Sequence, residues 1–274
     1  MNRCKVCDGP TEVTHKGLVL GRYEVTYSMC SVCEYWSTEE PYWLDEAYSD
    51  AIDSTDTGLV QRNLRLARQV GAMLPRLYPD GPYVDWAGGC GMFVRLMRDA
   101  GFDFYWQDRY AANLLARGFG WDGRGDGRKA TVVTAFEVLE HAPDPLAFFR
   151  EMIEGTGADA FFFTETLHPG PPVDPEWWYL APVTGQHISF YSSKTLETLA
   201  RQLGLHLRSW DTLHLMTRRP VDALAYRRAV TSAQLASVLS RVPGLAVRTP
   251  PTLTWADNLD LIQRRDSSSS EPSE

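Results

Sequence analysis

The sequence has 274 residues, 44% of them hydrophobic, which is enough for one full-sized domain with appended segments. Its formal net charge of −8 at pH 7 argues against a general electrostatic attraction to nucleic acid or to an anionic membrane. No apolar run approaches ~18 residues and no apolar stretch follows Met1, so we expect no transmembrane helix, no signal peptide and a cytosolic location.

Four of the five cysteines form two Cys-x-x-Cys pairs near the N-terminus, Cys4 with Cys7 and Cys30 with Cys33. Each pair is a short turn that can direct two thiolates toward one ion, so the spacing predicts a tetrahedral four-cysteine zinc site. Because all four ligands come from the protein, this zinc would be structural. The alternatives are two disulfides, which a cytosolic location disfavours, and two redox-active pairs, which the duplication disfavours.

Residues 1–39 are predicted to fold as a zinc ribbon, because short apolar stretches that suit strands lie between the two cysteine pairs. Over residues 1–40, Asp and Glu outnumber Lys and Arg. A module that grips phosphates is expected to show the opposite balance, so binding of nucleic acid by the ribbon is disfavoured.

Residues 40–79 are predicted to form a helical connector. Asp56 and Thr57 are expected to cap its main helix, and Pro75 and Pro79 to end it before the next strand.

The segment from Tyr83 to Phe93 organises the rest of the chain. An apolar pair and Asp85 lead into the glycine-rich turn Ala87-Gly88-Gly89-Cys90-Gly91, and apolar residues at helical spacing follow from Phe93 to Ala100. The pattern predicts a strand, a tight turn and a helix. Such a turn lets a ligand approach the backbone closely and offers it a helix N-terminus, although it can also be a structural connection.

A second strand is predicted to end at Asp108, because Phe102, Phe104 and Trp106 alternate with the residues between them. In a βαβ nucleotide site, an acid at this distance after the glycines bonds the ribose hydroxyls. The alternative is a solvated acid in a turn. Further along, the β-branched run 131–135 and the aromatic run 160–164 predict buried parallel strands, and Asp144 before Pro145 predicts a helix start between them.

Three segments together resemble class I S-adenosylmethionine-dependent methyltransferases. The turn after Asp85 resembles their motif I, Asp-x-Gly-x-Gly-x-Gly, with Ala87, Gly89 and Gly91 at the glycine positions. Ala87 departs from the motif, and Gly88 stands beside it. The segment Ala135–His141 resembles the one that follows their fourth strand, and Gln186–Ser192 resembles a later motif of a subset.

The resemblance implies an α/β fold with a doubly wound, mostly parallel sheet over residues 80–218, closed by an antiparallel pair at 205–209 and 213–217. A Gly-rich loop at 118–129 replaces the usual third strand, so no acid that contacts adenine can be named. The residues implied to bind S-adenosylmethionine are Asp85, Ala87, Gly88, Gly89, Gly91, Asp108, Ala135, Phe136 and Glu137.

Further side chains in the core and in the connector are candidates for structural roles or for contacts with a ligand. Glu140 and His141 are expected to fix the loop or the following helix, while Glu165 is a candidate for substrate contact. Aromatic residues in the connector either attract the sulfonium cation of the cofactor or pack between ribbon and core. These residues are Tyr42, Trp43 and Tyr48.

The ribbon followed by this core is similar to sugar C-methyltransferases, which carry a further C-terminal domain that this shorter chain lacks. Where those enzymes have Tyr-His-Glu-His, this chain has Thr184, Gly185, Gln186 and His187. His187 is therefore the candidate catalytic base, although it can instead bond the backbone of a loop.

The chain is predicted to end in helices over residues 219–265 and a disordered tail over 266–274. The predicted function is methyl transfer from S-adenosylmethionine to a small molecule, a sugar or sugar-linked intermediate. The alternatives are an RNA methyltransferase guided by the zinc ribbon and a non-catalytic scaffold that binds the cofactor.

Overall fold

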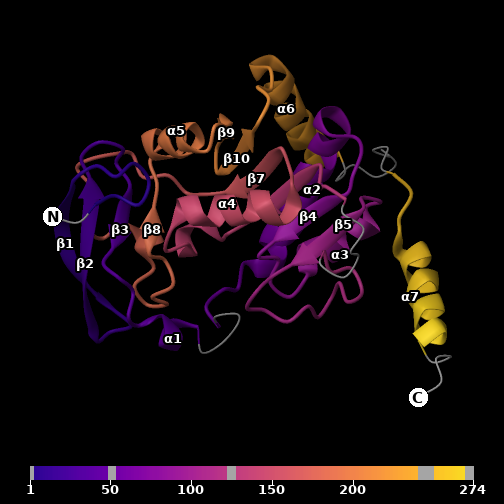
Figure 1. Ribbon diagram of the computed structural model, residues 1–274, viewed down its shortest axis with the longest axis horizontal. Coiled ribbons are helices and arrows are strands. Elements are labelled where there is room, and N and C mark those ends of the chain that lie inside the picture. Colours follow the sequence, from indigo (N-terminus) through magenta and orange to yellow (C-terminus); the bar gives the residue numbers. More distant parts are fainter. Residues whose placement is uncertain (1–2, 49–53, 122–127, 240–249, 269–274) are drawn as a thin grey trace. The chain divides into compact units, whose positions relative to one another are not determined.

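The protein is described by a computed structural model that covers residues 3–48, 54–121, 128–239 and 250–268 (Figure 1). No helix within these residues is long and apolar enough to cross a membrane. The chain divides into two compact units, one formed by residues 1–57 and 133–223 and the other by 58–132 and 224–274. The predicted boundaries after residues 39, 79 and 218 stay predictions.

The N-terminal sheet is antiparallel and has four strands in the order β1-β2-β3-β8. The strands are β1 (Thr11–Val19), β2 (Tyr23–Cys30), β3 (Trp36–Thr38) and β8 (Ser189–Phe190). The last strand comes from far along the chain, and its Phe190 lies opposite Trp36 in the pairing register. Both side chains belong to a buried apolar cluster that also contains Tyr27, Trp43 and Ile188.

The second sheet is mixed and has six strands in the order β5-β4-β6-β7-β10-β9. The strands are β4 (Tyr83–Trp86), β5 (Phe104–Gln107), β6 (Val132–Ala135), β7 (Ala160–Thr164), β9 (His206–Trp210) and β10 (Leu213–Thr217). β4 pairs in parallel with β5, and β6 with β7, whereas β10 runs antiparallel to both β7 and β9. The predicted α/β fold and its closing antiparallel pair are confirmed. The strands β4, β6, β7 and β10 consist mostly of apolar residues, as expected for strands that are buried along their whole length.

Helices follow the strands as the sequence predicted. They are α1 (Leu44–Ala47), α2 (Leu59–Leu77), α3 (Met92–Asp99), α4 (Pro145–Thr156), α5 (Ser193–Gln202), α6 (Ala223–Leu239) and α7 (Thr254–Ser268), with short 3-10 turns η2 (Leu139–His141) and η3 (Trp178–Leu180). The carboxylate of Asp144 caps α4 by accepting a bond from the backbone of Ala147 at 2.9 Å. Ser192 and Thr195 form a reciprocal capping box at α5.

The predicted ends of α2 are correct only in part, since the helix ends at Leu77, just before Pro79, but begins and continues differently from the prediction. Gly58 stands at its N-cap in place of Asp56 or Thr57, and Pro75 lies inside the helix. A proline removes only one helical hydrogen bond, and here it does so near the last turn, where Met73 and Leu74 are fully buried and hold the helix in place. Packing therefore outweighs the local signal to stop.

The Gly-rich segment after β5 keeps a single remnant of a strand. Gly120 forms one parallel bridge with Trp106 on β5, while residues 122–127 lie outside the described residues. In the same unit, α7 is held by Asp257, whose carboxylate receives two bonds from the buried guanidinium of Arg98, at 2.7 and 2.8 Å. This helix runs to Ser268, past the predicted start of the tail, and residues 269–274 of that tail lie outside the described residues.

Candidate functional site

The glycine turn after β4 has the backbone conformation that its motif predicts. Ala87, Gly89 and Gly91 all have positive φ, at 56°, 54° and 84°. A side chain at Gly91 would meet the Oδ1 atom of Asn113 at 2.8 Å, so no larger residue fits there without a shift. The turn delivers the chain directly into α3, with Gly91 at the N-cap. The three glycine positions of the motif are therefore the three left-handed residues of the turn.

Asp108 directly follows β5 and lies against this turn. Its Oδ2 atom accepts a bond from the backbone N–H of Gly89 at 2.9 Å, and its Oδ1 atom accepts from Tyr110 and Ala111 at 2.7 and 2.8 Å. The indole N–H of Trp106 donates to the carbonyl of Gly89 at 2.9 Å. Asp85, at 4% exposure, is buried at the end of β4. Three backbone donors thus fix the Asp108 carboxylate beside the glycines.

In the first unit, the residues after β6 form a second predicted part of the site. Ala135 ends the strand, Phe136 follows, and Glu137 has a positive φ of 56°. The hydroxyl of Thr164 at the end of β7 accepts a bond from the backbone N–H of Glu137 and donates to its Oε1 atom, both at 2.8 Å. These bonds hold Glu137 in a conformation that glycine would adopt more easily.

His187 and His141 meet in the same unit, which the sequence did not foresee. Their ring centroids are 5.0 Å apart. The Nδ1 atom of His187 bonds the carbonyl oxygen of Tyr179 at 2.6 Å, and Nδ1 of His141 bonds the carbonyl oxygen of Gln186 at 3.0 Å. Burial, together with the neighbouring His141, lowers the pKa of His187 below its usual range. The predicted loop contact of His187 is therefore present.

Glu140, which lies beside the two histidines, and Glu165 are both buried acids. Glu140 is 1% exposed, and its Oε1 atom accepts a bond from the hydroxyl of Tyr179 at 3.0 Å. Glu165 is equally buried, and burial, with the nearby charges of Glu140 and Glu137, raises its pKa well above the usual range. Glu165 was predicted to contact substrate, and its burial makes a direct contact less accessible than the sequence suggested.

The three connector aromatics differ in their surroundings, and the packing role holds for one of them. Trp43 is buried and donates its indole N–H to the carbonyl of Gly185 at 2.8 Å, which is the packing role. Tyr42 is mostly exposed. The ring of Tyr48 lies 6.1 Å from that of His141, so Tyr48 alone among the three borders the histidine pair.

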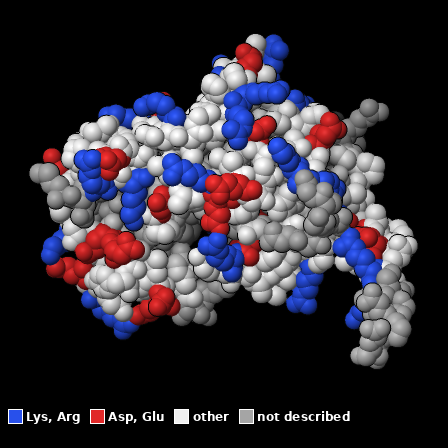
Figure 2. Space-filling model, viewed as in Figure 1, with Lys and Arg blue, Asp and Glu red and all other residues white. Residues whose placement is uncertain are grey.

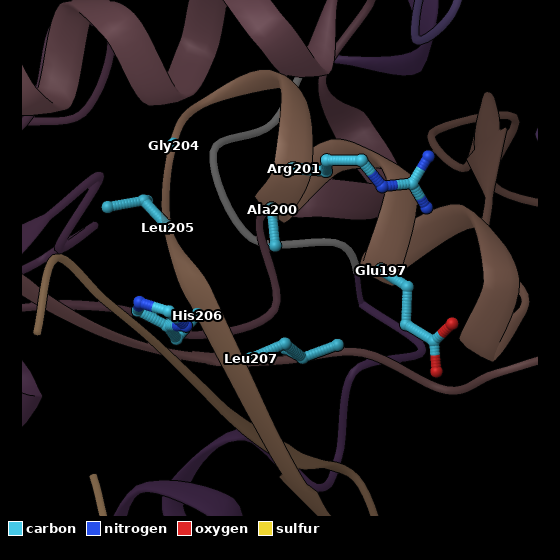
Figure 3. A pocket seen from close by; sticks show the side chains of 7 residues that line it. All are labelled: Glu197, Ala200, Arg201, Gly204, Leu205, His206 and Leu207. Carbon is cyan, nitrogen blue, oxygen red and sulfur yellow. The ribbon is translucent and has the colours of Figure 1, made fainter. Parts of the chain in front are cut away.

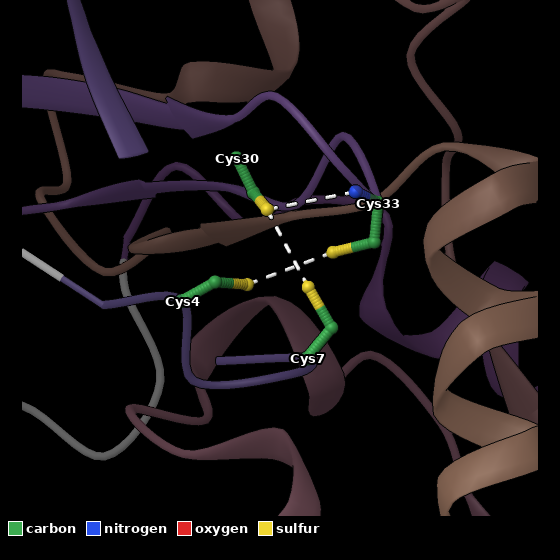
Figure 4. A group of neighbouring side chains, drawn as sticks. All are labelled: Cys4, Cys7, Cys30 and Cys33. Carbon is green, nitrogen blue, oxygen red and sulfur yellow. Dashed lines mark hydrogen bonds between the residues drawn. The ribbon is translucent and has the colours of Figure 1, made fainter. Parts of the chain in front are cut away.

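The four predicted zinc ligands converge in the ribbon (Figure 4). Cys4 faces Cys33 with their sulfurs 3.6 Å apart, and Cys7 faces Cys30 at 3.5 Å. All four sulfurs lie within 4.8 Å of one another. Tetrahedral ligands at Zn–S distances of ~2.3 Å are roughly 3.8 Å apart, whereas a disulfide needs about 2.05 Å. The cross-pairing between the two turns fits one ion and does not fit a disulfide within either pair.

A hollow on the surface of the first unit lies away from these residues (Figure 3). It is lined by the end of α5 and the start of β9, that is by Glu197, Ala200, Arg201, Gly204, Leu205, His206 and Leu207. None of the predicted site residues lines it. Both acidic and basic side chains occur on the face drawn in Figure 2.

Residues 60–209 match a protein-family model described as a methyltransferase domain, and this match spans more than half of the chain. The chain belongs to the methyltransferase domain family. The protein is an S-adenosylmethionine-dependent methyltransferase. The predicted enzyme class is thus confirmed, and the non-catalytic alternative is set aside.

Solved structures that resemble this methyltransferase do so at low identity. Magnesium protoporphyrin IX methyltransferase (ChlM) from Synechocystis PCC 6803 is 15% identical, with a TM-score of 0.39, over 65% of this chain and 96% of that one. An O-methyltransferase of neocarzinostatin biosynthesis (NcsB1) is 20% identical, with a TM-score of 0.45, over 65% of this chain and 61% of that one. An O-methyltransferase family 2 protein from Planctomyces limnophilus is 17% identical, with a TM-score of 0.44, over 64% of this chain and 65% of that one. The methyltransferase therefore spans less than two thirds of the length of the last two, and no curated protein matches its sequence.

Proposed function

We propose that this methyltransferase transfers the methyl group of S-adenosylmethionine to a small molecule, a sugar or sugar-linked intermediate. The observation that supports a small acceptor is the convergence of Glu140, His141 and His187, which are buried or half-buried. Enclosed polar groups of this kind suit a small ligand better than a folded RNA. The resemblance to sugar C-methyltransferases, on the ribbon and on His187, supports the sugar.

The cofactor is proposed to bind at the glycine turn. Asp85, Ala87, Gly88, Gly89 and Gly91 would border it closely, because the turn brings backbone without bulky side chains to the surface. Asp108 is already oriented by three backbone donors and would accept bonds from the ribose hydroxyls.

By the same resemblance, Ala135, Phe136 and Glu137 are proposed to contact the methionine part of the cofactor. The bonds of Glu137 with Thr164 hold it at the end of β6, where its backbone and side chain have fixed positions. Cofactor binding would then need no reordering of this turn.

S-adenosylmethionine supplies a methyl group on a positively charged sulfur, which is already activated for transfer. The protein has to align the acceptor atom with that sulfur and exclude water, and positioning supplies much of the acceleration. His187 is proposed to take the proton from the acceptor. Its Nδ1–H is donated to the carbonyl of Tyr179, so the lone pair lies on Nε2, where it can accept a proton as the methyl group is transferred.

Zinc is proposed as a structural ion in the ribbon, held by Cys4, Cys7, Cys30 and Cys33. Backbone N–H groups support the thiolates, since Val6 donates to the sulfur of Cys4 and Val32 to that of Cys30, both at 3.4 Å. Four protein ligands leave no position open for a substrate, so the ion would stabilise the ribbon and take no part in methyl transfer.

The acceptor class is tested by incubating the protein with radiolabelled S-adenosylmethionine and separate pools of nucleotide sugars, other small metabolites and RNA. Label in a small-molecule pool is expected. Label confined to RNA would overturn the proposal and favour the ribbon-guided alternative. Once an acceptor is known, His187→Ala should lower turnover by ~10²-fold or more and leave cofactor affinity unchanged. His206→Ala, which removes an exposed imidazole on β9, serves as the control. Near-normal turnover of the His187 variant would exclude the base role.

A further inference from the structure

The segment before β8 is tied to the short turn η2 by two hydrogen bonds. The N–H of Ile188 donates to the carbonyl of Glu140 at 2.9 Å, and Nδ1 of His141 bonds the carbonyl of Gln186 at 3.0 Å. These two bonds hold His187 against Glu140 and His141, although almost fifty residues of sequence separate the two segments. The convergence of the three side chains is thus built into the first unit.

Both imidazoles in this cluster are held in one tautomer. A carbonyl oxygen can only accept, so the Nδ1 atoms that bond Gln186 and Tyr179 must carry the hydrogens. In each neutral ring, the lone pair then lies on Nε2. A backbone carbonyl that receives the other ring N–H is the usual orienting partner of a histidine that ligates a metal.

Glu140 offers an oxygen that has no protein partner. Its Oε1 atom accepts from Tyr179, but its Oε2 atom is buried and has no hydrogen-bond partner among the described residues. Such a buried carboxylate oxygen raises the free energy of the folded state, because it has lost its hydrogen bonds to water and has no protein donor to replace them. An ion bound at this oxygen would remove that cost.

We propose that Glu140, His141 and His187 bind a divalent first-row transition metal of the zinc class. One ligand atom from each residue lies within 4.8 Å of the other two. Tetrahedral ligands at bonds of ~2.0–2.1 Å lie roughly 3.3 Å apart. Side-chain rotations that move the ligand atoms by about an ångström would therefore bring all three to bonding distance from one ion. Two imidazoles and one carboxylate suit zinc, iron(II) or cobalt(II) far better than calcium or magnesium, which prefer oxygen ligands.

Three protein ligands leave at least one position open on the ion, unlike the four cysteines of the ribbon. An acceptor oxygen bound there would lose its proton more readily, because a metal lowers the pKa of an oxygen ligand. In the metal-loaded protein, the ion would occupy the Nε2 lone pair of His187 and take over activation of the acceptor. Metal binding itself does not rest on the proposed function, since it is measured without any methyl acceptor.

Cobalt(II) titration of the untagged, metal-free full-length protein tests the proposal, because it distinguishes the two kinds of site by their spectra. Cobalt bound to the four thiolates gives intense sulfur-to-metal charge-transfer bands, whereas cobalt bound to two imidazoles and a carboxylate gives only weak ligand-field bands. We expect two cobalt ions per chain, one of each kind. One ion per chain with the thiolate spectrum alone would overturn the proposal, and this outcome needs no variant.

Variants then assign the second ion to its ligands. His141→Ala, His187→Ala and Glu140→Gln should each weaken binding of the second cobalt ion by about 100-fold or more and leave the thiolate bands unchanged, which also shows that the ribbon is folded. His206→Ala is the matched control and should retain both ions. A second ion that survives all three substitutions would bind elsewhere and would overturn the assignment. A failure to methylate sugars would leave these expectations untouched.

Discussion

The carboxylate of Asp108 accepts a hydrogen bond from the backbone N–H of Gly89 at 2.9 Å, which joins the acid that follows β5 to the turn that follows β4. Their spacing together with the resemblance to methyltransferases predicted that the two residues serve one cofactor. The bond gives that prediction a physical basis, because the position of the acid depends on the conformation of the turn.

Replacing Asp108 by Ala should weaken binding of S-adenosylhomocysteine by tenfold or more, about 1.4 kcal/mol, because charge-assisted bonds to the ribose would be lost. Isothermal titration calorimetry measures the affinity. Asp108→Asn keeps the size of the side chain and should also weaken binding. Asp80→Ala, at an exposed acid before β4, is the control and should bind normally. An unchanged affinity in Asp108→Ala would remove this residue from the site.

The two left-handed glycines of the turn should differ in their tolerance of a side chain. A Cβ at Gly89 meets nothing within 4 Å, whereas one at Gly91 meets Asn113 at 2.8 Å and Ala116 at 3.1 Å. Gly89→Ala should therefore lower the free energy of unfolding by the backbone cost alone, about 1 kcal/mol, and Gly91→Ala by roughly 1–3 kcal/mol more. Urea denaturation of both variants measures the difference, and equal losses would contradict the geometry.

Replacing Ala87 by Gly should stabilise the folded protein. Its φ of 56° is strained for any residue with a Cβ, so Ala87→Gly relieves about 1–2 kcal/mol in the folded state against an entropic cost of about 0.5–1 kcal/mol. A net gain in stability of up to about 1 kcal/mol is expected in urea denaturation. Ala112→Gly, at an exposed residue without positive φ, should show no gain. The same loss in both variants would mean that the strain at Ala87 is absent.

His214 should make the protein sensitive to acid. Burial lowers the pKa of His214 to about 4 in the folded protein, while the unfolded chain titrates near 6.5. The unfolded state therefore binds the proton first, and stability falls as the pH drops from about 6.5 to about 4, by on the order of 3 kcal/mol in total. Above about pH 6.5 this contribution is fully present.

The difference between wild type and His214→Gln isolates this effect, since other buried histidines contribute equally to both proteins. Glutamine can keep the bonds that His214 makes to the hydroxyl of Ser209 and the carbonyl of Glu165. Chemical denaturation at pH 7.5 and pH 5 should show a smaller loss for the variant. Identical losses would show that His214 does not titrate differently in the two states.

Cys7→Ser should release the ribbon zinc and destabilise the first unit, because ligand loss removes metal-binding energy from folding. Atomic emission and thiol titration before and after denaturation measure the metal and the protected cysteines. Cys90→Ser, which removes the cysteine of the glycine turn, should keep the zinc. A wild-type protein that is fully folded, free of metal and oxidised at its cysteines would refute the zinc site.

Local signals predicted much of the fold. A few neighbouring residues determine each of three features that the structure contains: the glycine turn, the cap at Asp144 and the buried strand at 160–164. Pro75 was wrongly predicted to end α2. The helix continues past it because the neighbouring residues are buried by tertiary packing, which the local sequence does not reveal.

The site was predicted less completely for a related reason. Asp108 and the four cysteines could be named because their spacing is fixed by short turns. The approach of His187 to Glu140 depends on bonds between segments almost fifty residues apart, and nothing in either segment identifies the other. The signal available in the sequence was the presence of two histidines and an acid in separate motifs.

Because β8 comes from late in the sequence, the sheet of the N-terminal ribbon is incomplete during much of synthesis. All four cysteines leave the ribosome early, but the free edge of β3 is covered only when Ser189 and Phe190 arrive, and Tyr35 bonds Ser189 at 2.7 Å. Until then the nascent chain would contain both Cys-x-x-Cys turns, but the edge of β3 would be unpaired and Trp36 would be exposed. Exposed apolar side chains and unpaired strand edges bind chaperones and promote aggregation. A fragment cut after residue 40 should therefore fail as an autonomous module, even though it contains every zinc ligand.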